Sequence, residues 1–234
     1  MKITIIYDNT VYKKGIRSDW GFSCLVEVEN TPRILFDTGT NGSILLYNMK
    51  KLNIDPTSID EVFISHAHFD HTGGLSAFLN VNNNVKVYVP VSFRGVRGSK
   101  EVISVSEPLK IHDNVFSTGE LDSIEQSMAV HPVRDSEVWL KAQREHISNG
   151  VKTEKGIVLV VGCSHPKMSH ILDAASQFGK VYAIIGGMHG FSEFEMFENL
   201  ELICPTHCTQ HQAALKSLYP EKYIEGGAGR IIEF

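Results

Sequence analysis

The sequence of 234 residues predicts an α/β protein in which buried strands alternate with helices. Short continuous apolar runs have the length of buried strands, and segments with apolar residues at helical spacing follow several of them. Polar segments rich in histidine and glycine stand where the strands end, which is where α/β sheets bind ligands. The length allows either one large domain or two small ones.

The composition is typical of a soluble globular protein, with 42% hydrophobic and 21% charged residues. The 27 acidic and 22 basic residues give a net charge of −5, which disfavours a nucleic-acid partner because such a partner requires a basic surface. No apolar run is long enough to cross a membrane, and Met1–Asp8 is too short for the apolar part of a signal peptide. We therefore expect a cytoplasmic protein that acts on a small molecule.

In the first third of the chain, loops with polar residues follow the expected strands. These strands cover residues 3–7, 22–29, 33–36 and 61–64. The third strand leads into Asp37-Thr38-Gly39, and the fourth leads into a histidine-rich loop. A helix over residues 42–52, with Ser43 as its N-cap, lies between them, and a second helix starts at Leu75.

The middle of the chain is rich in short strands, and turn residues separate these strands from one another. Strands are expected at residues 85–89, 102–105, 109–111, 115–117 and 126–130. The segment 138–147 differs, because it has helical propensity and Asn149-Gly150 is a typical helix end. We interpret residues 131–150 as an insertion that forms a helical flap, and a solvated surface excursion is an equally favoured alternative.

The last third of the chain repeats a strand followed by a helix. Strands at residues 156–161, 181–185 and 202–204 precede helices at residues 168–178, 193–200 and 210–218. Residues 224–232 then close the chain through a glycine-rich turn. This alternation is the basis of the α/β prediction.

The segment His66-Ala67-His68-Phe69-Asp70-His71 places three imidazoles and one carboxylate in one loop between a strand and a helix. A lone histidine is usually a solvated or core residue. Four such side chains would be desolvated together with no evident partner, so the set predicts a metal site. Three later strands also end at a histidine, namely His165, His189 and His207. Because ligands gather outside strand ends in α/β sheets, we expect one shared site.

The four cysteines are too few and too scattered for a disulfide framework in a chain of this length. Cys204 and Cys208 have zinc-like spacing, but a second cysteine pair to complete a structural zinc site is missing. Cys163 and Cys208 lie within two residues of expected ligands. We interpret them as small buried residues in preference to ligands or redox-sensitive thiols.

The motif His66-x-His68-x-Asp70-His71 resembles the signature of the metallo-β-lactamase superfamily, a group of mostly hydrolytic metalloproteins. Three later segments are similar to one branch of it, namely residues 162–166, 186–189 and 204–208. That branch includes small metal-dependent hydrolases and proteins similar to an archaeal pterin-ribofuranosylaminobenzene-phosphate synthase of methanopterin biosynthesis. The resemblance covers the whole chain and implies a single domain over residues 1–234. Its fold would be an αββα sandwich of two mixed β-sheets flanked by helices.

The resemblance also implies ligands for one or two divalent metal ions, with zinc as the first choice and manganese or iron as alternatives. The residues at the family's ligand positions are His66, His68 and His165 for the first ion and Asp70, His71 and His207 for the second. His189 stands where most of the family has a bridging carboxylate. An imidazole nitrogen has one lone pair, so we expect His189 to bind one ion terminally or to serve as a donor to substrate. The missing charge predicts one tight and one weaker ion.

Further expectations concern the surroundings of this binuclear site. The resemblance implies a Glu-His pair before a Gly-hydrophobic-Ser element, whereas the segment 18–23 of this chain reads Ser-Asp-Trp-Gly-Phe-Ser and lacks that pair. Asp37 is expected to orient a ligating imidazole or, equally, to be a turn carboxylate. The amides of residues 72–74 are expected to begin a helix and to hold an oxyanion.

The main function expected is a metal-dependent hydrolase. A metal-bound hydroxide would attack a small anionic, ester-like metabolite, with a phosphoester as the first choice, and Asp70 would bond to the nucleophile or relay its proton. One alternative is a metal-dependent transferase or synthase that acts on a pterin-like phosphorylated substrate. A further alternative is a metal-binding regulatory or redox protein without turnover.

Overall fold

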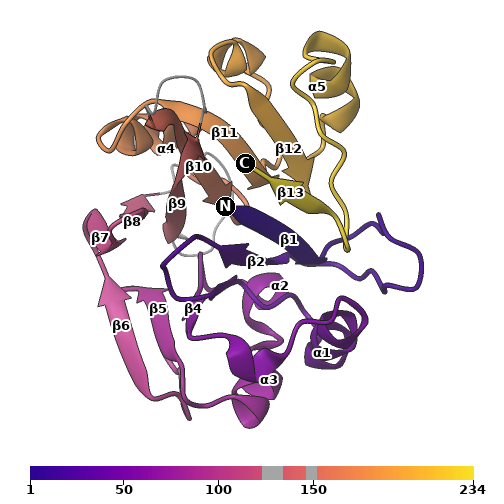
Figure 1. The fold of residues 1–234 in the computed structure, drawn as a ribbon, viewed down its shortest axis with the longest axis vertical. Helices are drawn as coiled ribbons and strands as arrows, with labels where there is room; N and C mark the ends of the chain where they lie inside the picture. The colour runs from indigo at the N-terminus through magenta and orange to yellow at the C-terminus, as the bar shows by residue number, and fades with distance from the viewer. Residues whose placement is uncertain (123–133, 146–151) are drawn as a thin grey trace, which may run out of the picture.

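The first of two facing mixed sheets contains the N-terminal strands. The computed structural model describes residues 1–122, 134–145 and 152–234. In these ranges the first sheet has the order β13-β1-β2-β3-β4-β5-β6, and β3 to β6 run parallel to one another (Figure 1). Its strands are β1 (Lys2–Tyr7), β2 (Ser23–Glu27), β3 (Ile34–Phe36), β4 (Glu61–Phe63), β5 (Lys86–Pro90), β6 (Glu101–Val105) and β13 (Ile231–Glu233).

The second sheet has the order β12-β11-β10-β9-β8-β7, and β10, β11 and β12 are parallel neighbours. Its strands are β7 (Leu109–His112), β8 (Val115–Asp122), β9 (Arg134–Glu145), β10 (Lys152–Val161), β11 (Val181–Gly187) and β12 (Leu202–Thr206). The α-helices are α1 (Gly42–Lys51), α2 (Phe69–Thr72), α3 (Leu75–Val81), α4 (Met168–Ser176) and α5 (Gln212–Leu218). No helix in the described ranges is long and apolar enough to cross a membrane.

The apolar run of β10 contributes to two cores, because successive side chains of a strand point to opposite faces of a sheet. Val158 and Val160 lie in the core between the two sheets, together with Phe63 of the first sheet. Leu159 and Val161 lie in the core under α4 and α5. A third core packs α1 and α3 against the outer face of the first sheet. The αββα sandwich is therefore confirmed.

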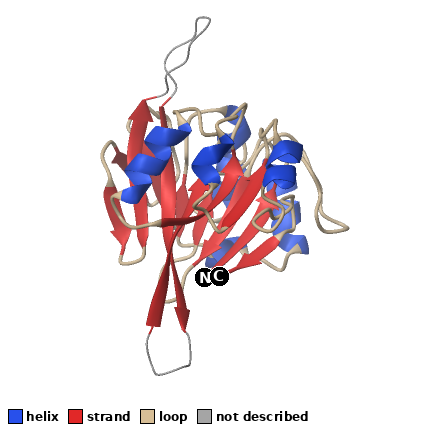
Figure 2. Cartoon of the chain, turned by 90° about the horizontal axis from the view of Figure 1, so that it is seen from above, coloured by secondary structure: helices blue, strands red, loops and turns tan. Residues whose placement is uncertain are grey.

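The prediction of a helix over residues 138–147 is wrong for residues 138–145, which belong to strand β9, and the last two residues of that range lie outside the described part of the chain. The strand pairs antiparallel with β8 on one side and with β10 on the other, and the β9-β10 pair extends as a long two-stranded arm (Figure 2). Backbone hydrogen bonding from two neighbouring strands overrides a weak helical propensity. The strand expected at residues 126–130 lies outside the described residues. The interpretation of residues 131–150 as an insertion stays a prediction.

Three smaller differences between the predicted and the observed helices concern a cap, a short 3-10 turn and an additional helical turn. Asn41, not Ser43, caps α1, because its Oδ1 accepts the backbone N–H of Ser43 at 2.9 Å. The helix expected over residues 193–200 is a short 3-10 turn, η2 (Phe194–Phe197). The histidine-rich loop contains a helical turn of its own, α2, before α3 begins. Asp70 and His71 therefore project from a turn of helix.

Candidate metal centre

The candidate site lies where five strands end. β3 and β4 are parallel neighbours in the first sheet, and β10, β11 and β12 are parallel neighbours in the second. Parallel strands end at the same edge of a sheet, so the loops after these strands come together. Those loops carry Asp37, the 66–71 motif, Cys163 to His165, His189 and His207. The structure brings the histidines after these strands together. The ring of His189 lies 4.7 Å from that of His165, and the ring of His207 lies 5.0 Å from that of His71.

The backbone after four of these strands is held in the left-handed region. The φ angles are 52° at Asp37, 57° at Ser164, 39° at His189 and 47° at His207. A non-glycine residue adopts this conformation at a cost of about 1–3 kcal/mol, and such residues cluster at functional sites. These four positions follow β3, β10, β11 and β12, at the edge of the sheets where the candidate ligands lie.

Asp37 connects the two motifs of the first sheet. Its carboxylate is fully buried and accepts the backbone N–H of Ser65 at 2.8 Å and the Ser65 hydroxyl at 2.7 Å. Its Oδ2 also lies 2.6 Å from Nδ1 of His71. A ring whose Nδ1–H donates to a carboxylate presents the lone pair of Nε2 on its other side. Of the two interpretations of Asp37, the structure supports the orienting contact.

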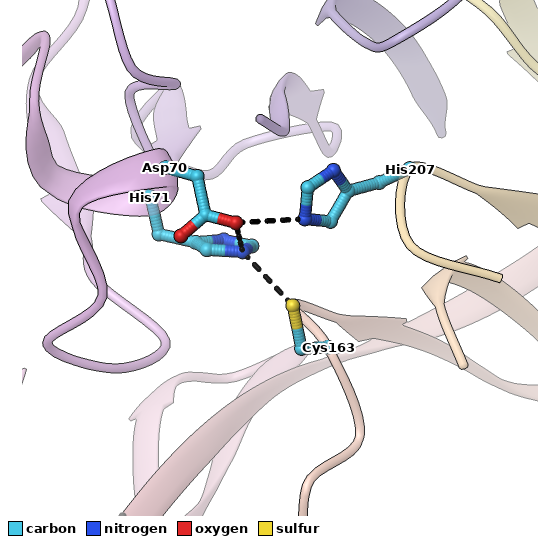
Figure 3. Close-up of side chains that lie close together, drawn as sticks. All are labelled: Asp70, His71, Cys163 and His207. Carbon is cyan, nitrogen blue, oxygen red and sulfur yellow. Dashed lines mark hydrogen bonds and ion pairs between the residues drawn. The ribbon is translucent and has the colours of Figure 1, made fainter. Parts of the chain in front are cut away.

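One group of ligand atoms contains Asp70, His71, Cys163 and His207, all within 4.8 Å of one another (Figure 3). Oδ2 of Asp70 lies 3.2 Å from Nε2 of His207 and 3.8 Å from Nε2 of His71. Nε2 of His71 lies 3.1 Å from Sγ of Cys163. Burial raises the pKa of the Asp70 carboxyl, but the close contact with the His207 ring and the adjacent His71 imidazole outweigh it and hold that pKa well below its usual range.

The chemistry of this group fits a divalent metal ion. Nδ1 of His207 lies 3.0 Å from Oδ1 of Asn9, so the ring is fixed from behind. Nε2 of His207 is buried and has no hydrogen-bond partner among the described residues, although it faces the Asp70 carboxylate. Two imidazole nitrogens, a carboxylate oxygen and a sulfur converge on one buried point, which is a donor set that zinc accepts.

A second group contains His66, Cys163 and His165. His68 lies beside it, with Nδ1 at 3.1 Å from Nε2 of His66 and its ring 4.7 Å from that of His165. The three imidazoles expected on the first ion are therefore brought together. Nδ1 of His66 lies 2.8 Å from the Ser65 hydroxyl, which fixes that ring.

His189 lies on the His165 side of the site. Its Nε2 is 2.9 Å from Nε2 of His165, and it forms a third group of candidate ligands with Cys163 and Cys208. A hydrogen bond with Cys163 lowers the pKa of the Cys208 thiol below its usual range, against the effect of burial and with help from His189.

Two residues of the site were not singled out as functional by the sequence argument. Cys163 belongs to all three groups, and its place just after a strand and two residues before His165 is the signal that could have identified it. Trp20 donates its indole N–H to Oδ2 of Asp70 at 2.9 Å, and its ring lies 5.0 Å from that of His207. The segment 18–23, which lacks the Glu-His pair usual in the branch, therefore places an aromatic ring at the site.

The prediction that the amides of residues 72–74 hold an oxyanion is wrong. The amide of Thr72 donates to the His68 carbonyl at 3.1 Å, that of Gly73 to Phe69 at 2.7 Å and that of Gly74 to Gly39 at 3.0 Å. α2 begins earlier than expected, so these amides close its turns and tie it to the loop after β3. They are not available to a ligand.

Sequence comparison corrects the main function expected. The chain is 31% identical to the 7,8-dihydropterin-6-methyl-4-(β-D-ribofuranosyl)-aminobenzene-5'-phosphate synthase of Methanocaldococcus jannaschii, over 99% of this chain and 95% of that protein. The hydrolase prediction is therefore contradicted, because this near full-length relative is a synthase. It supports the transferase or synthase alternative. The hydrolase expectation arose because the ligand motif is shared across a superfamily whose members differ in their substrates.

Comparison of structures and of family models gives the same assignment of fold. A metal-dependent hydrolase of the beta-lactamase superfamily matches with a TM-score of 0.70 and 26% identity over 100% of this chain and 99% of that one. The Zn²⁺-bound PqqB of Methylobacterium extorquens, 11% identical over the whole of both chains, has the same fold with a TM-score of 0.59. Residues 21–133 match the family model of the metallo-beta-lactamase superfamily. With its near full-length synthase relative, this chain belongs to the metallo-beta-lactamase superfamily, in the branch that contains that synthase.

Proposed function

We propose that the protein is a metal-dependent transferase that joins a pterin-like substrate to a phosphorylated partner. The observation that carries this proposal is the identity of 31% over nearly the full length of both chains to a synthase whose product contains a dihydropterin and a ribosyl-aminobenzene phosphate. In the reaction that we propose, an arylamine nitrogen forms a bond to the 6-methyl carbon of the pterin. The bond from that carbon to its leaving group breaks, and the amine loses a proton.

His66, His68 and His165 would hold a first divalent ion, and Asp70, His71 and His207 a second one. Zinc is the first choice for both ions, with manganese or iron as alternatives, because imidazoles with a carboxylate accept all three. Bound there, the ions would neutralise an anionic leaving group and orient the two substrates.

The side chains around these ligands supply the remaining functions. Asp70 stays ionised and is 19% exposed, so it can accept a hydrogen bond from the attacking amine and orient it, and the proton that the amine releases passes to solvent. His189 is half-buried beside His165 and can donate an N–H to the substrate. Both residues are catalytic candidates under this proposal.

Two features favour an aromatic, anionic substrate. Trp20 and Phe69 are 56% and 68% exposed, and both adjoin Asp70, one through its hydrogen bond and the other as its chain neighbour. Exposed rings at such a place can stack on a flat pterin or aminobenzene. A pocket of about 330 Å³ adjoins His189 and is lined in part by Ser164, Lys167 and Phe191. Lys167 is exposed at the N-terminus of α4, where a phosphate is favoured.

The direct test is a coupling assay. Metal-loaded protein is mixed with a dihydropterin that carries a leaving group on its 6-methyl carbon and with 4-(β-D-ribofuranosyl)-aminobenzene 5'-phosphate, and products are followed by liquid chromatography and mass spectrometry. We expect the coupled product, and its loss in the His66→Ala/His68→Ala variant. Fully metal-loaded protein that forms none of this product would overturn the proposal.

A further inference from the structure

Cys163 occupies the middle of the site. It is 1% exposed, one residue separates it from the end of β10, and its Sγ is the one atom common to the three groups of candidate ligands in the described residues. One group contains His66 and His165, and another contains Asp70, His71 and His207. The sulfur therefore lies between the residues proposed for the first ion and those proposed for the second.

The contacts of the sulfur support this position. Nε2 of His71 lies 3.1 Å from Sγ, and Figure 3 shows the thiol pointing toward His71 and Asp70 from the opposite sheet. His71 is held from behind by Asp37, so its Nε2 presents a lone pair toward the same space as the sulfur. In the metal-free protein the thiol S–H of Cys163 donates to this nitrogen. A divalent ion that displaces the thiol proton would be bound by the sulfur and by Nε2 together.

We propose that the thiolate of Cys163 is a ligand shared by both metal ions, in the role that the sequence had assigned to the position of His189. This inference rests on the proposed two-ion site but not on the identity of the substrates. A thiolate sulfur carries several lone pairs and can bind two ions at once. The imidazole of His189 has one lone pair on its deprotonated nitrogen and lies against His165 instead.

The shared thiolate changes the expected metal binding. It restores the negative charge that the site lacks with His189 in place of a carboxylate, so both ions are bound tightly. Thiolate ligands also favour Zn²⁺, Co²⁺ and Fe²⁺ over Mn²⁺ and Mg²⁺. The earlier expectation of one tight and one weaker ion follows only if Cys163 does not bind.

Cys208 is the rival thiol. Its Sγ shares a group with Cys163 and His189 alone, and that group has no carboxylate and none of the residues of the 66–71 motif. Cys24 is the core control, because it is fully buried in the core between the sheets and belongs to none of the three groups of candidate ligands in the described residues. Substitution of each thiol in turn therefore distinguishes the proposed ligand, Cys163, from its neighbour Cys208 and from the core residue Cys24.

The test uses cobalt as the probe. Metal-free protein is titrated with Co²⁺, and the sulfur-to-cobalt charge-transfer band in the near ultraviolet is recorded together with the metal content. We expect the band in the wild type, in Cys208→Ser and in Cys24→Ala, and its loss in Cys163→Ser. The content should fall from about two ions per chain to about one in Cys163→Ser.

A band that persists in Cys163→Ser, or that disappears only in Cys208→Ser, would overturn the proposal. X-ray absorption of the zinc-loaded wild type keeps the test independent of whether any variant folds. We expect a sulfur shell at about 2.3 Å in addition to nitrogen and oxygen at about 2.0–2.1 Å. Zinc-loaded protein without a sulfur shell would also refute it. Because neither measurement involves turnover, a protein that couples no pterin can still pass both.

Discussion

Nδ1 of His71 lies 2.6 Å from Oδ2 of Asp37, and both side chains are fully buried. The same carboxylate accepts two hydrogen bonds from Ser65, so it fixes the loop that carries His66 as well as the ring of His71. A carboxylate behind a ligating imidazole raises the basicity of the ring and fixes its tautomer. The geometry of the candidate metal ligands therefore depends on a residue that belongs to none of the candidate groups in the described residues.

Replacing Asp37 by Asn should lower metal affinity by roughly 10–100-fold, because the amide is a weaker acceptor for the Nδ1–H of His71. The measurement is zinc affinity by competition with a chromophoric chelator. Asp55→Asn is the matched control, because that residue is exposed and bonds only within the turn of residues 55–58. Equal affinities of Asp37→Asn and wild type would contradict the orienting role.

Trp20 should report on the binding of an aromatic substrate, because its exposed ring adjoins Asp70 and His207. In a Trp139→Phe background, Trp20 is the single tryptophan of the chain, and a dihydropterin should quench its fluorescence. Trp20→Ala should weaken pterin binding about fivefold, as the loss of roughly 1 kcal/mol of ring contact implies. Binding by equilibrium dialysis checks this value, and Tyr47→Ala serves as a control because that ring packs on Arg17. Unchanged affinity in Trp20→Ala would remove the ring from the substrate site.

Lys167 should contribute to binding of the phosphate group. Lys167→Ala should raise the KM for the phosphorylated arylamine about tenfold and leave the KM for its dephosphorylated form unchanged, because one charge-assisted hydrogen bond is worth about 1.5 kcal/mol. Steady-state kinetics with both forms measure this difference. Lys180→Ala is the control, since that lysine is exposed after α4, at the start of β11. Equal effects on both substrates would show that Lys167 does not recognise the phosphate.

Glu61 and His112 join the two sheets at a distance from the metal centre. Oε2 of Glu61 on β4 lies 2.7 Å from Nε2 of His112 on β7, and Glu61 is 3% exposed. His112→Ala should lower the free energy of unfolding by about 1–3 kcal/mol, because it leaves a buried carboxylate with the Tyr88 hydroxyl as a remaining partner. Urea denaturation measures the change. Lys110→Ala should have little effect, because its pair with Asp113 is exposed.

The raised pKa of the Asp8 carboxyl predicts that the stability of the metal-free protein depends on pH. Burial raises the pKa of its carboxyl from 3.8 to about 6, although hydrogen bonds from backbone amides, that of His207 first, oppose the shift. Between these values the folded state keeps a proton that the unfolded state has released, so stability falls as the pH rises from about 4 to about 6. Asp8→Asn should lack this fall, as urea denaturation across that range would show. A constant difference between Asp8→Asn and wild type would refute the shifted pKa.

Much of the fold follows from local patterns in the chain. The apolar runs at β1, β10 and β11 and the helical spacing at α1 and α4 are consequences of burial on one or two faces, and each was predicted within a few residues. The strand β9 was not predicted from the sequence, because it forms through backbone hydrogen bonds to β8 and β10, which local patterns do not reveal.

The sequence by itself determined that His66, His68, Asp70 and His71 lie together in one short segment after a buried strand, and it predicted their role as ligands. It also determined that His165, His189 and His207 follow strands of the same kind. Only the tertiary structure decided which of these side chains face one another. It placed Cys163 between the two halves of the site, His189 against His165, and Trp20 on Asp70. The physical reason is that periodicity fixes which face of a strand is buried, whereas the direction of a side chain after the strand depends on turns such as those at Asp37 and His207. Those turns are held in the left-handed region by contacts with remote parts of the chain.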